Sequence, residues 1–149
     1  MSTMSDLASP YRNYLAAMVL FHFAAAESSG LGLTHYQASS LLDLEQPLTN
    51  GQLAKRLGLS PGATTRVVDR LIEMGLARRV TDPADRRRTL IEHSGELPEE
   101  LTALLNPVRG QIAELVSQLS PHQLDGLRSY FLGAAQIYAD ATRDTEATD

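Results

Sequence analysis

Apolar residues recur at helical spacing between residues 61 and 74, and this stretch organises the interpretation of the whole chain. Steps of four, four and three place its apolar positions on one helical face: Ala63, Val67, Leu71 and Met74. Ser60 can cap such a helix, and Pro61 can occupy its first position, where a missing N–H removes no hydrogen bond. The pattern predicts a helix from Pro61 to Met74 that ends before Gly75.

A second helix is predicted immediately before this one. Thr49 can cap it, and Gln52 completes a capping box, because each side chain can bond the other residue's backbone N–H. Leu53 faces inward, and Gly58 can adopt the positive φ that a tight corner requires. Together the two helices predict a helix–turn–helix.

A β-hairpin is predicted directly after the second of these helices. Residues 76–81 and 89–91 have strand character, and Asp82 and Pro83 begin the turn between them. The consecutive arginines Arg86, Arg87 and Arg88 lie close to its tip. Helix, turn, helix and basic hairpin define a winged helix.

Four further helices are predicted around the winged helix, and three of them have more apolar surface than one chain can bury. Their expected ranges are 10–28, 34–45, 97–119 and 121–141. Pro10 is expected to open the first and Thr34 to cap the second, whereas Pro107 should kink or weaken the third. The first helix is apolar around most of its circumference, which favours burial against a partner subunit. A monomeric helical bundle is the alternative.

The predicted fold is therefore mainly α with a small β-hairpin wing. A winged helix–turn–helix at residues 48–95 is flanked by N- and C-terminal dimerisation helices. Residues 1–47 and 96–149 form this helical dimerisation region, and the two parts make one intertwined domain per chain.

Three segments resemble the MarR-type transcriptional regulators. Leu48–Ser60 is similar to the family's "LT-x-x-ELA-x-x-LGLS" segment, Ala63–Leu71 to its recognition helix, and Asp82–Arg87 to its wing signature. The resemblance implies a cytoplasmic homodimer that binds double-stranded DNA at a pseudo-palindromic operator, most often as a repressor. It also implies release by a small aromatic or phenolic effector. Leu90–Gly95 departs from the family's "V-x-LT-x-x-G", so the second wing strand is expected to be short or irregular.

Charge is distributed in a way that agrees with DNA binding. The chain has a net charge of −5, but residues 49–93 hold nine Lys and Arg against five Asp and Glu, a local charge of +4. Because the local field governs encounter with phosphates, this segment is expected to face DNA. A winged helix that contacts protein instead is the alternative function, and RNA binding is disfavoured because no aromatic stacking platform accompanies the basic residues.

Other function classes find little support in the sequence. The 149 residues contain no P-loop, G-x-G-x-x-G or G-x-S-x-G motif, so no enzyme activity and no cofactor are expected. There is no cysteine, which excludes disulfides and thiol-based sensing. The four histidines lack metal-ligand spacing, so no metal site is expected. Neither a signal peptide nor a membrane span is expected.

The candidate DNA contacts lie on the predicted recognition helix and on the wing: Ser60, Pro61, Gly62, Thr64, Thr65, Arg66, Arg70, Arg86, Arg87 and Arg88. Arg66 is the candidate for a bidentate contact to guanine, with a phosphate contact or an ion pair to Asp69 or Glu73 as alternatives. An arginine of the wing suits a narrow minor groove. The family's "D-x-R" spacing implies that Asp85 supports the wing by holding an arginine in place.

The resemblance also places an effector pocket between the dimer helices and the DNA-binding module. Polar and aromatic side chains near the predicted pocket are its candidates: His22, Phe23, His35 and Tyr36. Each of them has a structural alternative, because aromatic residues are commonly core residues and a lone histidine on an apolar face is commonly just hydrogen-bonded.

Overall fold

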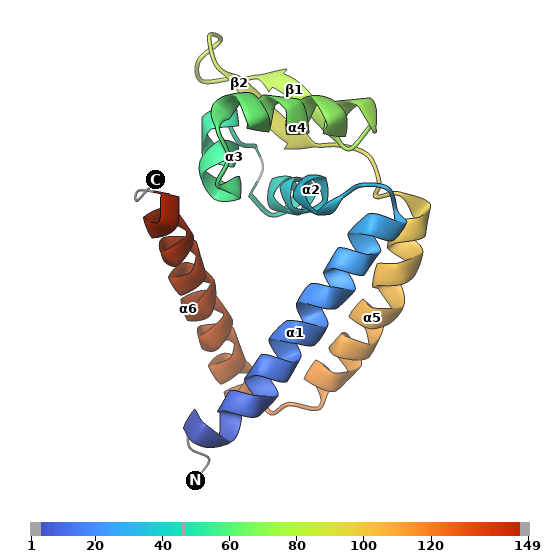
Figure 1. Ribbon diagram of the computed structural model, residues 1–149, viewed down its shortest axis with the longest axis vertical. Coiled ribbons are helices and arrows are strands. Elements are labelled where there is room, and N and C mark those ends of the chain that lie inside the picture. The colour runs from blue at the N-terminus through green and yellow to red at the C-terminus, as the bar shows by residue number, and fades with distance from the viewer. Residues whose placement is uncertain (1–3, 46, 147–149) are drawn as a thin grey trace.

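The computed structural model describes residues 4–45 and 47–146, with two strands and helices of very different lengths (Figure 1). Its elements are, in order, α1 (Met4–Ser28), α2 (Leu33–Glu45), α3 (Asn50–Leu57), α4 (Pro61–Glu73), β1 (Ala77–Thr81), β2 (Thr89–His93), α5 (Glu99–Ser117) and α6 (Pro121–Glu146). Helices α2, α3 and α4 gather with the hairpin at one end, α1 and α5 connect this end to the far end of the molecule, and α6 runs from the far end back toward α3. The predicted fold class, mainly α with a hairpin wing, is confirmed.

The local signals of the helix–turn–helix are all present. The Thr49 hydroxyl accepts a hydrogen bond from the Gln52 N–H at 3.2 Å, and the Gln52 side chain accepts one from the Thr49 N–H at 2.8 Å. Gly58 has φ +63°, the left-handed conformation expected at the corner. The Ser60 hydroxyl accepts from the Ala63 N–H at 3.2 Å, so α4 begins as predicted.

The second wing strand is neither short nor irregular, so that expectation was wrong. β2 pairs antiparallel with β1 along five residues, from Thr89 opposite Thr81 to His93 opposite Ala77. Its second edge is also supported, because Leu48 exchanges two backbone hydrogen bonds with Ile91, at 3.0 and 2.7 Å. Ile91 therefore has a paired strand residue on one side and Leu48 on the other, and its side chain is buried.

Several predicted helix ends differ from the observed ones. α1 begins at Met4, so Pro10 lies inside the helix rather than opening it. Pro10 lies beyond the first turn of α1, so the helix lacks the hydrogen bond that a backbone N–H at this position would donate to the Asp6 carbonyl. α2 begins at Leu33, which puts Thr34 inside that helix. α5 continues across Pro107 as one helix, and α6 extends to Glu146.

The hydrophobic core lies where the DNA-binding module meets the ends of α1 and α5. Its largest fully buried apolar side chains come from six elements or their junctions: Leu42, Leu53, Val68, Leu71, Leu76, Ile91 and Leu101. Because α2, α3, α4 and both strands contribute to this one core, the orientation of α4 is fixed relative to the wing.

The three long helices keep much of their apolar surface exposed. α1 and α5 lie side by side, whereas α6 diverges from α5 (Figure 1). α6 touches α1 through Tyr11, whose ring meets that of Tyr130 edge-on at 6.3 Å and whose hydroxyl is hydrogen-bonded to that of Tyr138. Along α6 the exposed apolar side chains are Leu124, Tyr130, Phe131, Leu132, Ile137 and Tyr138.

No single helix of the described chain is both long enough and apolar enough to span a membrane. One pair of helices, residues 5–28 and 33–45, meets these criteria when taken together, but the pair is sharply bent between its two helices.

Candidate nucleic-acid interface and effector cavity

The outer face of α4 presents polar side chains to solvent. Gly62 and Thr65 are exposed near the start of the helix, and no atom outside the immediate backbone lies within 4 Å of a Cβ built on Gly62. The first turn is therefore open to close approach by a large ligand. Thr65 donates its hydroxyl hydrogen to the Pro61 carbonyl at 2.9 Å, so part of its hydrogen-bonding capacity is already used within the helix.

Arg66 is exposed on this face and has no acidic partner among the residues that the structure describes. The two carboxylates that could have held it pair with other arginines. Asp69 accepts from Arg79 of β1 at 2.7 Å, and Glu73 pairs with Arg70 at 3.1 Å. The alternative of an ion pair between Arg66 and either acid is therefore not realised, and the Arg66 guanidinium remains available to another molecule.

Thr64 does not belong to the exposed set, and its assignment as a DNA contact is corrected here. It is fully buried, and its hydroxyl donates to the Ser60 carbonyl at 3.0 Å. Thr64 lies one helical turn before Val68, so both face the core. Ser60 is exposed, but its hydroxyl caps α4. Pro61 is also exposed at the start of this helix.

The wing tip is held in shape by two aspartates. The Asp85 carboxylate accepts from the Arg87 N–H at 3.0 Å and from its Nε at 3.3 Å, so the expected contact between Asp85 and an arginine is present. Asp82 accepts from the Ala84 N–H at 2.8 Å and lies 3.6 Å from the Arg88 guanidinium. Arg86 alone of the three wing arginines lacks an acidic partner in the described chain.

Sequence reasoning missed the role of Asp82. This residue is largely buried, and its backbone N–H donates to the Arg88 carbonyl at 3.0 Å, which closes the loop between the strands. An aspartate followed by proline and then a second aspartate is a turn-forming pattern, because aspartate side chains bond the backbone two residues on. That pattern could have identified both wing-supporting residues.

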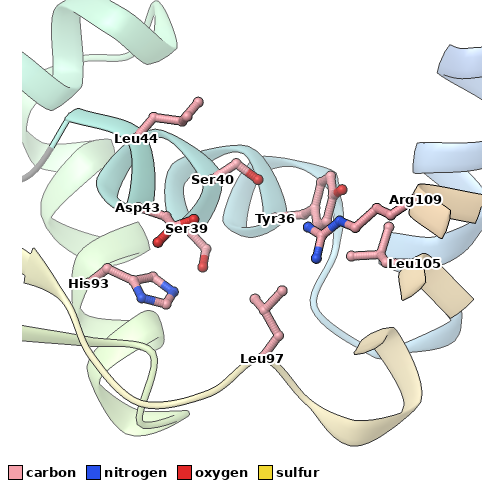
Figure 2. Close-up of a pocket in the computed structure, with 9 residues that line it drawn as sticks. All are labelled: Tyr36, Ser39, Ser40, Asp43, Leu44, His93, Leu97, Leu105 and Arg109. Atoms are coloured by element: carbon pink, nitrogen blue, oxygen red, sulfur yellow. The ribbon is translucent and has the colours of Figure 1, made fainter. Parts of the chain in front are cut away.

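Behind the DNA-binding module, a cavity of about 230 Å³ opens between α2, the end of β2 and α5 (Figure 2). Its lining comprises Tyr36, Ser39, Ser40, Asp43, Leu44, His93, Leu97, Leu105 and Arg109. A second cavity of about 360 Å³ lies between α1 and α5, where His22 lines it, and the two cavities share Leu105 and Arg109.

The structure brings together only part of the expected effector pocket. The His22 Nδ1 lies 2.7 Å from the Tyr36 hydroxyl, within hydrogen-bonding distance, and these residues line neighbouring cavities. Phe23 is half-exposed on α1, and neither Phe23 nor His35 lines either cavity. Side chains consecutive on a helix point in different directions, so Phe23 does not share the direction of His22, and a pocket role for Phe23 and His35 stays a prediction.

Arg109 is close enough to influence both hydrogen-bonded side chains. Burial, with a smaller contribution from the Arg109 charge, lowers the pKa of His22 below its ordinary value. Burial raises the pKa of Tyr36, and the same arginine partly opposes this rise. The neutral forms of both side chains are therefore favoured beside a cation. Arg109 is the single basic residue of α5, a signal that could have pointed to this site from the sequence.

A helix–turn–helix, an exposed arginine on the outer face of its second helix, and a basic two-stranded wing define the winged helix–turn–helix class of DNA-binding proteins. The MarR family matches residues 33–89, which include α2, α3, α4, β1 and the wing loop up to the first residue of β2. The uncharacterized HTH-type transcriptional regulator YcgE of Bacillus subtilis is 34% identical over 127 residues, covering 85% of this chain and 82% of that protein.

A second relative, the uncharacterized HTH-type transcriptional regulator Mb0904 of Mycobacterium bovis, is 32% identical over 102 residues, 68% of this chain and 71% of that protein. Among solved structures, a mutant of MepR from a multidrug-resistant S. aureus clinical isolate has a TM-score of 0.71 at 18% identity, covering 93% of this chain and 99% of that one. A MarR family regulator from Silicibacter pomeroyi has a TM-score of 0.63 at 24% identity, covering 93% and 96%.

The chain therefore belongs to the MarR family and is a DNA-binding transcriptional regulator with a winged helix–turn–helix. The relatives described above are named as HTH-type transcriptional regulators.

Proposed function

We propose that the chain is a cytoplasmic homodimeric repressor that binds a pseudo-palindromic operator and is released from it by a small molecule. The observation that carries this proposal is the pair of arginines left without acidic partners in the described DNA-binding module, Arg66 on α4 and Arg86 on the wing. An exposed, unpaired guanidinium at each of two elements suits two adjacent grooves of one duplex.

The positions of the two arginines indicate which groove each one contacts. Arg66 lies on the outer face of a helix, the element that a major groove admits, and its planar fork suits the two acceptors of guanine. Arg86 lies at the tip of a hairpin whose neighbouring arginines are held by Asp82 and Asp85. We therefore assign the minor-groove contact to Arg86, with Arg87 and Arg88 shaping the tip beside it.

Exposed apolar surface on the long helices supports the dimer. α1, α5 and α6 each present several large apolar side chains to solvent, and α6 is covered by little of its own chain. Patches of this extent are unusual on a stable monomer. Two-fold packing of these helices would bury them and would set two copies of α4 about 34 Å apart, one turn of B-DNA.

The cavity of Figure 2 supports release by a small molecule. Tyr36 and Ser39 belong to α2, which packs against α4 and β2 of the winged helix, whereas Leu105 and Arg109 belong to α5, which packs against α1. A ligand that contacts both sides would change the position of the DNA-binding module relative to its partner copy. A shift of this kind changes the spacing of the two recognition helices and lowers affinity for a fixed operator.

The test begins with a selection of duplexes from a random library by the full chain, followed by fluorescence anisotropy on the enriched inverted repeat. Replacing Arg86, Arg87 and Arg88 together with alanine should abolish duplex binding while the mass of the dimer is unchanged. If about six to ten phosphates are contacted, affinity should fall about a thousandfold or more between 50 and 200 mM salt. Enrichment of no sequence, or binding that ignores salt, would instead favour a winged helix that contacts protein.

Repression and release are tested separately. A reporter gene carrying the selected operator between promoter and start site should be silenced by the wild-type chain and not by the triple variant. Titration of the protein–DNA complex with a panel of aromatic acids, phenols and amphoteric aromatic compounds should release the duplex for at least one compound. Increased reporter output in the presence of the chain would contradict repression, and retention of the duplex with every compound would contradict release.

A further inference from the structure

The cavity between α2, β2 and α5 has charged side chains of opposite sign at its two ends. Arg109 lies at one end beside Tyr36 and Leu105, and Asp43 lies at the other (Figure 2). Neither charged group has an ion-pair partner in the part of the chain that the structure describes. In this view Leu97 lies between them and contributes an apolar side chain to the lining.

Helix geometry gives the length of the cavity along α2. Tyr36, Ser39 and Asp43 follow one another at steps of three and four, which places them on one face of α2. Seven residues of α-helix separate the Tyr36 end from Asp43, a rise of about 10 Å. A ligand with charges at opposite ends of one aromatic ring, plus a hydrogen bond at each end, has about this length.

Ser39 supplies an independent sign that the cavity is built for a polar molecule. Its side chain is only 1% exposed, lines the cavity, and its Oγ has no hydrogen-bond partner among the described residues. Figure 2 shows this side chain pointing from α2 toward the space above Leu97. A buried hydroxyl without a partner is unfavourable, so a ligand that bonds it gains affinity from a group already in place.

We propose that this cavity binds an amphoteric molecule of single-ring size, with its carboxylate at Arg109, its ammonium group at Asp43 and a hydrogen bond to Ser39. The volume of 230 Å³ is below the range of about 300–1,000 Å³ typical of drug-sized ligands, which is why the ligand is limited to one ring. This inference rests on the proposed release by a small molecule and names the chemical class of that effector.

Such a ligand would connect α5 with the end of α2 that leads into the helix–turn–helix. Its carboxylate would be held by α5, and its ammonium group by the end of α2 that leads into the helix–turn–helix. A purely anionic ligand would engage α5 only. Recognition of both charged groups of the ligand therefore explains why Asp43 and Arg109 line the same cavity. The Asp43 carboxylate would repel a simple anion from its end of the cavity.

The experiment uses three probes that differ only in their charged ends: 4-(aminomethyl)benzoate, 4-methylbenzoate and 4-methylbenzylamine. Isothermal titration calorimetry measures each against the full chain without DNA at pH 7.5. Each singly charged probe lacks one charged group and therefore loses one charge-assisted contact with the cavity. The amphoteric probe should bind about tenfold or more tightly than either of them. Equal binding of 4-methylbenzoate and 4-(aminomethyl)benzoate, or no saturable heat with any probe, would overturn the proposal.

Two variants test which cavity residue binds which charged group of the probe. Asp43→Asn should remove the preference for 4-(aminomethyl)benzoate over 4-methylbenzoate, and Arg109→Gln should remove its preference over 4-methylbenzylamine. Asp125→Asn, an exposed substitution on α6 away from the cavity, is the matched control and should leave all three affinities unchanged. If both cavity variants keep the wild-type preferences and have circular dichroism spectra like the wild type, then Asp43 and Arg109 do not bind the two charged groups as proposed.

Separate measurements keep this inference distinct from the proposed function. Duplex binding and dimer mass are determined on the same preparation. A chain that binds the amphoteric probe selectively but no duplex supports the cavity assignment and contradicts the proposed repressor. A chain that binds its operator but shows no preference among the three probes contradicts the cavity assignment alone.

Discussion

Replacing Arg66 with alanine tests how α4 recognises DNA. Arg66 has no acidic partner in the described chain, so its removal leaves no carboxylate newly unpaired. The free energy of unfolding should therefore change by less than about 0.5 kcal/mol, as at other exposed sites. The whole effect should appear in binding.

The size of the binding effect follows from the contact and from the proposed symmetry. A bidentate arginine–guanine contact discriminates by about 1–3 kcal/mol, and a dimer makes it twice, which corresponds to a loss of affinity from about 30-fold to more than 10⁴-fold. The loss should be confined to operators with guanine at the contacted position, and other duplexes should be bound nearly as before.

Fluorescence anisotropy measures the affinity of the wild-type and Arg66→Ala chains for the selected operator and for duplexes in which each half-site base is changed in turn. Arg128→Ala, on α6 outside the DNA-binding module, removes the same charge and should leave affinity unchanged. If Arg66→Ala instead weakens all duplexes equally and lowers the salt slope by about one, Arg66 contacts a phosphate and the assignment to guanine is refuted.

Three further predictions concern stability, each measured by urea unfolding at a fixed protomer concentration. Leu71→Ala removes a fully buried side chain and should lower the free energy of unfolding by about 2–5 kcal/mol, and a loss below about 1 kcal/mol would contradict the described core. Gly95→Ala should lower it by at least about 1 kcal/mol, because the residue has φ +73° and the new Cβ would lie 2.6 Å from the Gly75 carbonyl oxygen. Gly51→Ala, in open space within α3, is its matched control and should be neutral or stabilising. The pKa of His22 is lowered in the folded chain from 6.5, so the unfolded chain binds more protons below that pH, and stability should fall as pH decreases from 6.5 through the folded pKa. His22→Gln should remove this part of the pH dependence, and an unchanged pH profile would count against the burial of His22.

The helix–turn–helix was predictable because its signals are local. Thr49, Gln52, Gly58 and Ser60 act within one turn of their own helix, so their spacing along the chain determines their hydrogen bonds. The burial of Thr64 was equally readable, since its spacing to Val68 places it on the inner face, but its hydroxyl suggested an exposed role.

The wing and the cavity depend on contacts between distant segments. The regular second strand is supported by the backbone of Leu48, which precedes the helix–turn–helix, and no pattern within residues 89–93 indicates that partner. The cavity combines Ser39 of α2 with Arg109 of α5, and only packing brings these two helices together. A polar residue on an otherwise apolar helix is a useful signal for such sites, but it does not name the residue opposite.

The central claim is that two copies of this chain hold one duplex, and mass in solution tests it most directly. Sedimentation equilibrium of the free chain should give twice the subunit mass of 16.2 kDa, and addition of the selected inverted repeat should give one dimer per duplex. A free mass of 16.2 kDa, or a complex that contains a single subunit per duplex, would contradict the account.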